Sequence, residues 1–381
     1  MTLPDPQELL EAFSLALDLS GQRHLEHALR TCCLSMGLSA VLGLSKRERE
    51  QIYYLSLLHD LGSLGPSPRT RPMMKVNGKL IEPDLSQLGW TSGVKSHRPD
   101  PPESPLRKLL PGALSPHPWE RLVSFADQVE IRMSEGKEDK KALIRSSRKW
   151  LACMEDFRIW EAFRTLTEDE GFWTAIRRKN LAHSIKKERP ASLTFTVEEY
   201  ETFIQALSDL VDSKSYFTAR HSRRVSDMAH RLSIEMGLNE PSVEEVRLAG
   251  LFHDLGKLAV PQGILDKPGR LRAEEYEVIK LHSYHTQAIL EKITGFSRVA
   301  MLAGAHHERI DGKGYHRRLR GNQVSMGARI LAASDAYDAL TNIRPYRYGM
   351  PPDKALMVIG EEEGDHFDPE VLEALRRVAL G

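Results

Sequence analysis

The chain has 381 residues, more than one hydrophobic core ordinarily serves, so we expect two domains. Apolar residues make up 41% and charged residues 28%, the balance of a soluble globular protein. Basic and acidic residues number 53 each, and this neutral balance argues against duplex DNA as the main partner, because counterion release needs a basic surface. A small anionic ligand stays compatible with it, since such a ligand needs only a few local cations.

The sequence carries no visible targeting or crosslinking feature. Its three cysteines, two of them adjacent, form neither a disulfide framework nor a CxxC metal pair. The opening MTLPDPQELLEAF lacks the basic and then apolar order of a signal peptide, and no segment approaches the roughly 20 apolar residues of a membrane span. We therefore predict a cytoplasmic protein without a membrane anchor. A homodimer and a regulatory protein partner are both left open.

The first half of the chain has a helical pattern interrupted by one Pro-rich stretch. Residues 7–60 repeat apolar side chains at three- and four-residue steps. Residues 62–118 contain SLGPSPRTRP, HRPDPPESP and SPHP, and this density of Pro favours irregular or extended chain. Helical periodicity returns in residues 119–133 and continues through 150–178. We expect helices on both sides of a long loop.

A second helical series follows a linker. The run KKERPAS at residues 186–192 is the predicted linker, and Thr196 with Glu199 has the pattern of a capping box at the start of the next helix. Strand signals are nearly absent. The sequence predicts an all-α fold of two helical domains in tandem, residues 1–188 with the Pro-rich insert and residues 189–381.

The two halves resemble each other, which indicates a duplicated domain. His59 follows His27 after 32 residues within LLHDLG, and His253 follows His221 at the same interval within LFHDLG. Each half then has a second helical segment ending in Asp, ERLVSFAD in the first and ARILAASD in the second. Three matches in the same order are difficult to attribute to chance.

The second half contains an unusual density of metal-ligand residue types beside apolar sequence. They are His221, His253, Asp254, His282, His306, His307 and Asp335. Buried imidazoles and carboxylates are costly unless they are satisfied, and a divalent cation satisfies several at once. Imidazole and carboxylate together suit Fe, Mn, Zn or Ni. Seven groups exceed the need of one ion, so we predict two ions with a bridging carboxylate, about 4 Å apart as in phosphoester hydrolysis.

Four segments of this half are similar to the HD-GYP family of the HD superfamily: HDLGKLAVP, HHERIDGKGY, ARILAASDAYDALTNIRPYR and GDHFDPEVLEAL. The resemblance spans roughly residues 197–378. It implies an all-helical hydrolase of cyclic di-GMP with an iron or manganese centre, held by the seven residues above with Asp254 as the bridge. Some members bind a third metal through a Glu four residues before the first His. That position is Phe217 here, so we expect two ions in this half.

The resemblance also suggests catalytic and substrate-binding residues. Water held between two cations becomes hydroxide near neutral pH and can attack phosphorus in line. Lys257 lies about one helical turn beyond Asp254, and the resemblance places it on the scissile phosphate or the leaving oxygen, where its charge would stabilise the transition state. The candidate substrate contacts are Tyr315, Arg344, Arg347 and Asp338.

The sequence departs from the family pattern in one loop. His316 stands where the signature has Pro, and Arg317 and Arg318 follow where a Gly is usual. This change bears on loop rigidity and substrate choice. The leading hypothesis is hydrolysis of cyclic di-GMP to pGpG and on to GMP. The alternatives are another 3′,3′-linked cyclic dinucleotide such as cyclic GMP–AMP, and a regulatory protein that binds the nucleotide with little turnover.

The first half keeps a reduced set of the same residues. His27, His59, Asp60 and Asp127 form the minimal H…HD…D set of an HD domain, enough for one ion. Ser63 stands at the position of Lys257, and no His-His pair occurs before residue 190. We predict a degenerate copy without hydrolase activity, with a sensory, regulatory or packing role. A single structural or regulatory metal is the alternative.

Overall fold

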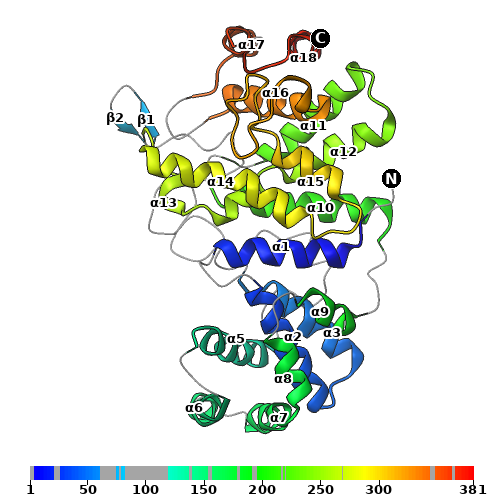
Figure 1. Ribbon diagram of the computed structural model, residues 1–381, viewed down its shortest axis with the longest axis vertical. Helices are drawn as coiled ribbons and strands as arrows, with labels where there is room; N and C mark the ends of the chain where they lie inside the picture. The colour runs from blue at the N-terminus through cyan, green and yellow to red at the C-terminus, as the bar shows by residue number, and fades with distance from the viewer. Residues whose placement is uncertain are drawn as a thin grey trace. The chain divides into compact units, whose positions relative to one another are not determined.

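A computed structural model of the chain describes the following residues: 4–20, 26–60, 74–76, 79–81, 119–136, 140–152, 157–177, 181–190, 195–215, 218, 220–267, 269–343, 348–362 and 365–381. The fold is all-α, as the sequence predicts, and helices form nearly all of its regular structure (Figure 1). None of the helices in these ranges is long and apolar enough to cross a membrane.

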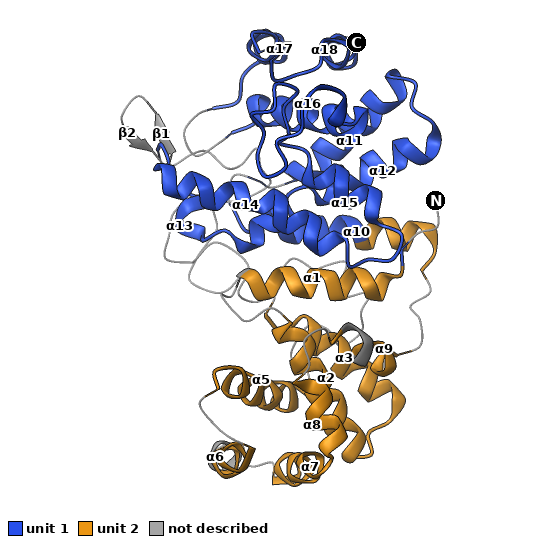
Figure 2. Ribbon diagram, viewed as in Figure 1, with its two compact units in different colours: residues 1–4, 64–102, 204–381 blue, residues 5–63, 103–203 orange. Residues whose placement is uncertain are grey.

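The chain forms two compact units (Figure 2). One contains residues 5–63 and 103–203 and is called the N-terminal unit below. The other contains residues 1–4, 64–102 and 204–381 and is called the C-terminal unit. The division falls within helix α10, Val197–Asp212, fifteen residues beyond the predicted domain boundary at 188. That boundary and the tandem arrangement of two HD-type domains stay predictions.

The N-terminal unit consists of helices on both sides of the predicted Pro-rich insert. They are α1 Pro6–Ser20, α2 His27–Val41, α3 Lys46–Leu57, α5 Glu120–Ser134, α6 Lys140–Ala152, α7 Phe157–Glu168, α8 Glu170–Ile176 and α9 Ala182–Glu188. Ser45 and Glu48 form a capping box that starts α3. The α2 helix packs against α1, α3, α5 and α7, so it is the centre of this unit. Its α9 helix extends through part of the predicted linker.

The helices of the C-terminal unit come after the start of α10, which begins at the predicted capping box. Thr196 N donates to Glu199 Oε2 at 2.8 Å, and Glu199 N donates to Thr196 Oγ1 at 3.2 Å. Its further helices are α11 His221–Glu235, α12 Glu240–Phe252, η3 Leu255–Ala259, α13 Gln262–Leu265, α14 Ala273–Leu290, α15 Ser297–Gly304, η4 Gly321–Gln323, α16 Met326–Thr341, α17 Pro352–Gly360 and α18 Pro369–Leu380. The capping-box prediction is confirmed.

The core of this unit lies between α11, α12 and α16. Val225, Ala229 and Leu232 follow one another at helical spacing along α11 and are fully buried. Gly250 allows α12 to approach closely, because a Cβ there would lie 2.7 Å from Ser226 Cα of α11. The same close packing positions His221 at the start of α11, His253 at the end of α12 and Asp335 within α16.

One short hairpin interrupts the helical architecture. Strands β1, Met74–Val76, and β2, Lys79–Ile81, pair antiparallel with Met74 opposite Ile81. The Pro-rich sequence predicted irregular or extended chain here, and both strands were missed. The Asn-Gly dipeptide at residues 77–78 is a hairpin signal that the surrounding Pro residues obscured. The other residues of the predicted insert, 62–118, lie outside the part that the structure describes.

Candidate metal centre

The seven predicted ligands of the C-terminal unit meet at one place. His221 begins α11, His253 and Asp254 connect α12 to η3, His282 lies within α14, His306 and His307 follow α15, and Asp335 lies within α16. Four of the five histidines lie at or just beyond helix ends, where packing of the apolar helix faces determines their position. Residues separated by more than a hundred positions in the sequence are therefore in contact range.

A first group of donor atoms comes from α11, α12 and α16. The Nε2 atom of His221 lies 3.3 Å from Asp335 Oδ1, and that of His253 lies 3.9 Å from the same oxygen. Ligands that each lie about 2.1 Å from one ion are about 3.0–3.4 Å apart, depending on the coordination geometry. The observed separations are close to these values. This group can hold one divalent ion after a small adjustment.

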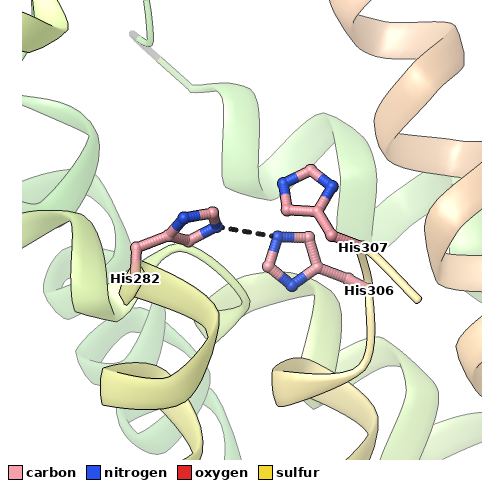
Figure 3. A group of neighbouring side chains, drawn as sticks. All are labelled: His282, His306 and His307. Atoms are coloured by element: carbon pink, nitrogen blue, oxygen red, sulfur yellow. Dashed lines mark hydrogen bonds between the residues drawn. The ribbon is translucent and has the colours of Figure 1, made fainter. Parts of the chain in front are cut away.

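A second group comes from α14 and the end of α15, and Figure 3 shows its three imidazole rings. His282 Nε2 lies 3.1 Å from His306 Nε2, and the ring centroids of His306 and His307 are 4.0 Å apart. Each of the three offers one ring nitrogen, and these nitrogens all lie within 4.8 Å of one another. An all-imidazole set of this kind suits a transition metal better than Mg²⁺ or Ca²⁺.

Asp254 lies between the two groups and faces each with a different oxygen. Its Oδ2 is 3.5 Å from His221 Nε2 and 3.3 Å from His253 Nε2, whereas its Oδ1 is 3.5 Å from His282 Nε2 and 3.9 Å from His306 Nε2. Burial opposes its ionisation, yet the neighbouring His253 and Lys257 hold the pKa of this carboxyl well below its usual range. A charged carboxylate in this position can bridge two cations.

Backbone carbonyl groups determine which ring nitrogens face the centre. The Nδ1 atoms of His253, His282 and His306 donate to the carbonyl oxygens of the residues three positions earlier, at 2.8, 2.6 and 2.6 Å. An imidazole that donates from Nδ1 in its neutral form keeps a lone pair on Nε2. Outer contacts of this kind orient metal-ligating histidines in proteins.

The burial of these side chains fits a bound metal. Burial lowers the pKa of His282 to about 4 and that of His307 to about 3, so both rings are neutral near pH 7 and able to ligate. His253 Nε2 and Asp254 Oδ1 are buried without a hydrogen-bond partner among the described residues. Such atoms are costly in a protein interior unless a cation satisfies them. The donor set therefore fits two divalent ions with mixed nitrogen and oxygen ligands.

A glycine brings the two groups close enough to share Asp254. A Cβ on Gly256 would lie 2.0 Å from the carbonyl oxygen of His282, so only Gly allows η3 to pack this closely on α14. Thr286 holds the contact, accepting a hydrogen bond from Gly256 N at 2.8 Å and donating to His253 O at 2.9 Å. The Gly of the HDLGK motif thus has a steric role that the sequence analysis did not assign.

Lys257 and Tyr315 lie beside the ligand side chains. Lys257 Nζ contacts Asp254 Oδ2, and 22% of its side chain is exposed, whereas Asp254 is almost fully buried. The Tyr315 ring lies 4.4 Å from the ring of His307, centroid to centroid, and its hydroxyl is 3.2 Å from that of Tyr276. Both side chains reach the edge of the centre from which a substrate can approach.

Asp338, a predicted substrate contact, lies behind the ligand His221. Its carboxylate is 5% exposed and accepts hydrogen bonds from His221 Nδ1 at 2.6 Å and Arg224 Nε at 2.6 Å. These contacts occupy both oxygens, so the carboxylate is turned away from a substrate in the centre. In place of the predicted substrate contact, we assign it the orientation of His221. The signal was present in the sequence, because Asp338 follows Asp335 by about one turn of the same helix.

Replacement of Asp338 by Ala is expected to weaken metal binding at the first group by about 10–100-fold, the usual cost of losing an outer partner of a ligating histidine. Metal titration followed by elemental analysis measures it. Asp338→Asn keeps an acceptor oxygen and should lose less. Equal affinity in the wild type and the Ala variant would show that His221 needs no such support.

Three residues named in the sequence analysis cannot be placed, and one residue of the site was not predicted. Arg344, Arg347 and Phe217 lie outside the described residues, and their roles stay predictions. Glu308 was missed, although it directly follows the His pair. It is 2% exposed and accepts from Arg317 N at 3.0 Å and Leu319 N at 2.8 Å, which fixes the loop that carries Tyr315. An acidic residue between a ligand pair and a Gly-rich loop was the available signal.

Comparisons with known proteins agree with this site. Residues 205–371 match the HD domain family. A Vibrio cholerae protein named 3′3′-cGAMP-specific phosphodiesterase 3 is 26% identical over 97% of this chain and 94% of its own length. Its relative named 3′3′-cGAMP-specific phosphodiesterase 1 is 28% identical over 95% and 89%. A Thermotoga maritima protein named cyclic di-GMP phosphodiesterase is 34% identical over 53% of this chain and 57% of its own length.

The fold agrees as well. A solved structure of a cyclic GMP-AMP-specific phosphodiesterase of Vibrio cholerae matches 99% of this chain and 98% of its own, with a TM-score of 0.66 and 24% identity. Helices around clustered His and Asp side chains define the class of HD-type metal-dependent phosphohydrolases. Within that class, the chain is similar to the HD-GYP phosphodiesterases, and the resemblance predicted from the sequence is confirmed.

Proposed function

We propose that the C-terminal unit hydrolyses a 3′,3′-linked cyclic dinucleotide, with 3′,3′-cyclic GMP–AMP as the preferred substrate. The observation that carries the proposal is the position of Asp254, whose two oxygens face two separate groups of metal-ligand side chains. A pair of divalent ions held this way would activate water and offset the charge of a phosphodiester. Iron and manganese are the preferred candidates, with zinc and nickel as alternatives.

The chain's own groups have separate roles in this reaction. Lys257 carries a positive charge beside Asp254 and is partly exposed, so it can contact a phosphate oxygen at the centre and stabilise the charge that develops there. Tyr315, against His307, offers a ring face and a hydroxyl for the nucleotide. His221 is kept in position by Asp338.

The choice of cyclic GMP–AMP reverses the order of the two candidates from the sequence analysis. The relatives that align with nearly the entire chain are named for that nucleotide, whereas the Thermotoga maritima relative named for cyclic di-GMP aligns with about half of it. The altered loop is consistent with a changed preference, because His316 is exposed and its ring lies 6.0 Å from that of Tyr284. Cyclic di-GMP is the second candidate.

Parallel turnover of the two nucleotides by manganese- or iron-loaded protein is the test. We expect kcat/KM for cyclic GMP–AMP to exceed that for cyclic di-GMP by at least about tenfold, a difference of about 1.4 kcal/mol in transition-state binding. Chromatography of the products gives both rates. A preference for cyclic di-GMP would contradict the proposed specificity. Binding of either nucleotide without product, at verified metal content, would favour the regulatory-binding alternative.

A further inference from the structure

The N-terminal unit contains a second cluster of donor atoms, from the ends of α2 and α3 and from α5. His27 Nε2 lies 3.1 Å from Asp127 Oδ1 and 3.3 Å from His59 Nε2. Asp60 Oδ2 is 3.8 Å from His27 Nε2 and 3.7 Å from His59 Nε2. These separations are similar to those in the first group of the C-terminal unit and close to the spacing of ligands around a single ion.

Outer contacts aim both imidazoles of this cluster inward. His27 Nδ1 contacts Glu130 Oε2, and both side chains are 1% exposed. His59 Nδ1 donates to Ser56 O at 2.7 Å. Each ring therefore uses Nδ1 for the outer contact and directs Nε2 at the two aspartates. This is the arrangement of ligating histidines with their supporting partners.

The supporting residues repeat those of the C-terminal unit. Glu130 follows Asp127 by three residues, as Asp338 follows Asp335, and each carboxylate binds the Nδ1 atom of the first histidine. The histidine after α3 binds the carbonyl oxygen three residues earlier, as His253 does. A cluster retained only for packing has no need of the outer carboxylate.

The backbone around the first histidine is repeated too. In each unit a non-Gly residue in the left-handed region precedes it, Glu26 with φ 71° and Arg220 with φ 57°. The residue after this histidine donates its backbone N–H, at 3.0 Å, to a buried Asp ten residues earlier in the chain. The acceptor is Asp18 in one unit and Asp212 in the other. Such uncommon backbone geometry persists where the local structure is needed.

From this match we infer that the N-terminal unit binds one divalent transition-metal ion through His27, His59, Asp60 and Asp127. Two imidazoles and two carboxylates suit Mn, Fe, Zn or Ni. The His27 side chain is 1% exposed, whereas those of His59, Asp60 and Asp127 are 12%, 16% and 16% exposed. The ion would thus have a side open to water or to a small anion. It adds to the two ions expected in the C-terminal unit.

We assign this ion a structural or regulatory role. Ser63 stands where the C-terminal unit has Lys257, so the sequence lacks the cation that would stabilise a phosphate in the transition state. An ion held by α2, α3 and α5 would connect the helices at the centre of the unit. It would stabilise the folded unit, because a ligand that binds only the folded state stabilises that state.

Manganese loading of the full chain tests the inference with a matched pair of variants, Asp127→Ala and Asp335→Ala, which change equivalent positions of the two clusters. Elemental analysis counts the ions, and electron paramagnetic resonance separates a coupled pair from an isolated ion. We expect the wild type to show both signals. Asp127→Ala should lose only the isolated ion, and Asp335→Ala should disturb only the pair.

The outcomes are distinguishable from failure of the proposed function, because neither readout uses substrate. An unchanged ion count in Asp127→Ala, or a wild type without an isolated ion, would overturn the inference. Glu161→Ala removes an exposed carboxylate of the same unit and should change nothing. If Asp127→Ala fails to fold, His59→Ala replaces it. The ratio of the isolated-ion signal to the coupled-pair signal in the wild type still shows whether the N-terminal unit binds an ion. Added manganese should also raise the melting temperature of Asp254→Ala, which lacks the bridging carboxylate of the C-terminal pair, but not of a variant that also carries Asp127→Ala.

Discussion

Replacement of Asp254 by Ala is expected to remove stable metal from both positions of the C-terminal centre and to lower turnover by at least about 10³-fold. One oxygen of this carboxylate faces His221 and His253, and the other faces His282. No other carboxylate among the described residues is shared in this way by the two groups. Elemental analysis of the loaded variant, together with its rate of cyclic dinucleotide hydrolysis, measures both effects.

The control for this variant is Asp227→Ala, which removes an exposed carboxylate from α11 of the same unit and should retain wild-type metal content and rate. Asp254→Asn tests charge at nearly constant volume and should also lose the pair, because an amide has only one oxygen to offer. If Asp254→Ala kept both ions, the bridging role would be wrong even if activity were lost.

The ligand residues could be predicted from the sequence because their chemistry is local. His253 and Asp254 are adjacent, and the pair His306-His307 ends an apolar helix, so residue type and flanking sequence sufficed. Which oxygen faces which group depends on how closely η3 approaches α14. That distance is determined by Gly256 and Thr286, which lie on different elements, and no single-sequence pattern reports it.

The errors have a similar cause. Asp338 was predicted to contact the substrate, but its carboxylate lies on His221 in the structure. Helical residues were recognised on both sides of residues 62–118, whereas the short hairpin of β1 and β2 was not, since three residues per strand give no period to detect. Helix periodicity is a strong signal in a sequence. Short strands, and contacts such as that of Asp338 with a ligand histidine, give only a weak signal.

Replacement of Lys257 by Ala is expected to lower kcat by about 10²–10³-fold, the usual cost of removing a charged group that stabilises the transition state. The Lys257 ammonium is the partly exposed cation beside the bridging carboxylate, so it can contact both Asp254 and a bound phosphate. Metal content should change little, because the histidines and aspartates that ligate are intact. Steady-state kinetics and elemental analysis of the same preparation measure the two quantities.

The two possible roles of Lys257 predict opposite results. If its charge served only to offset that of Asp254, its removal would alter metal affinity and leave the rate of the fully loaded enzyme nearly unchanged. If it acts on the phosphate, the loaded enzyme stays slow, and Lys257→Arg recovers part of kcat because it keeps the charge but changes its geometry. Lys354→Ala, which removes an exposed cation on α17, should have the wild-type rate in either case. The expected ratio of rates at equal metal content therefore distinguishes a catalytic contact from charge balance within the centre.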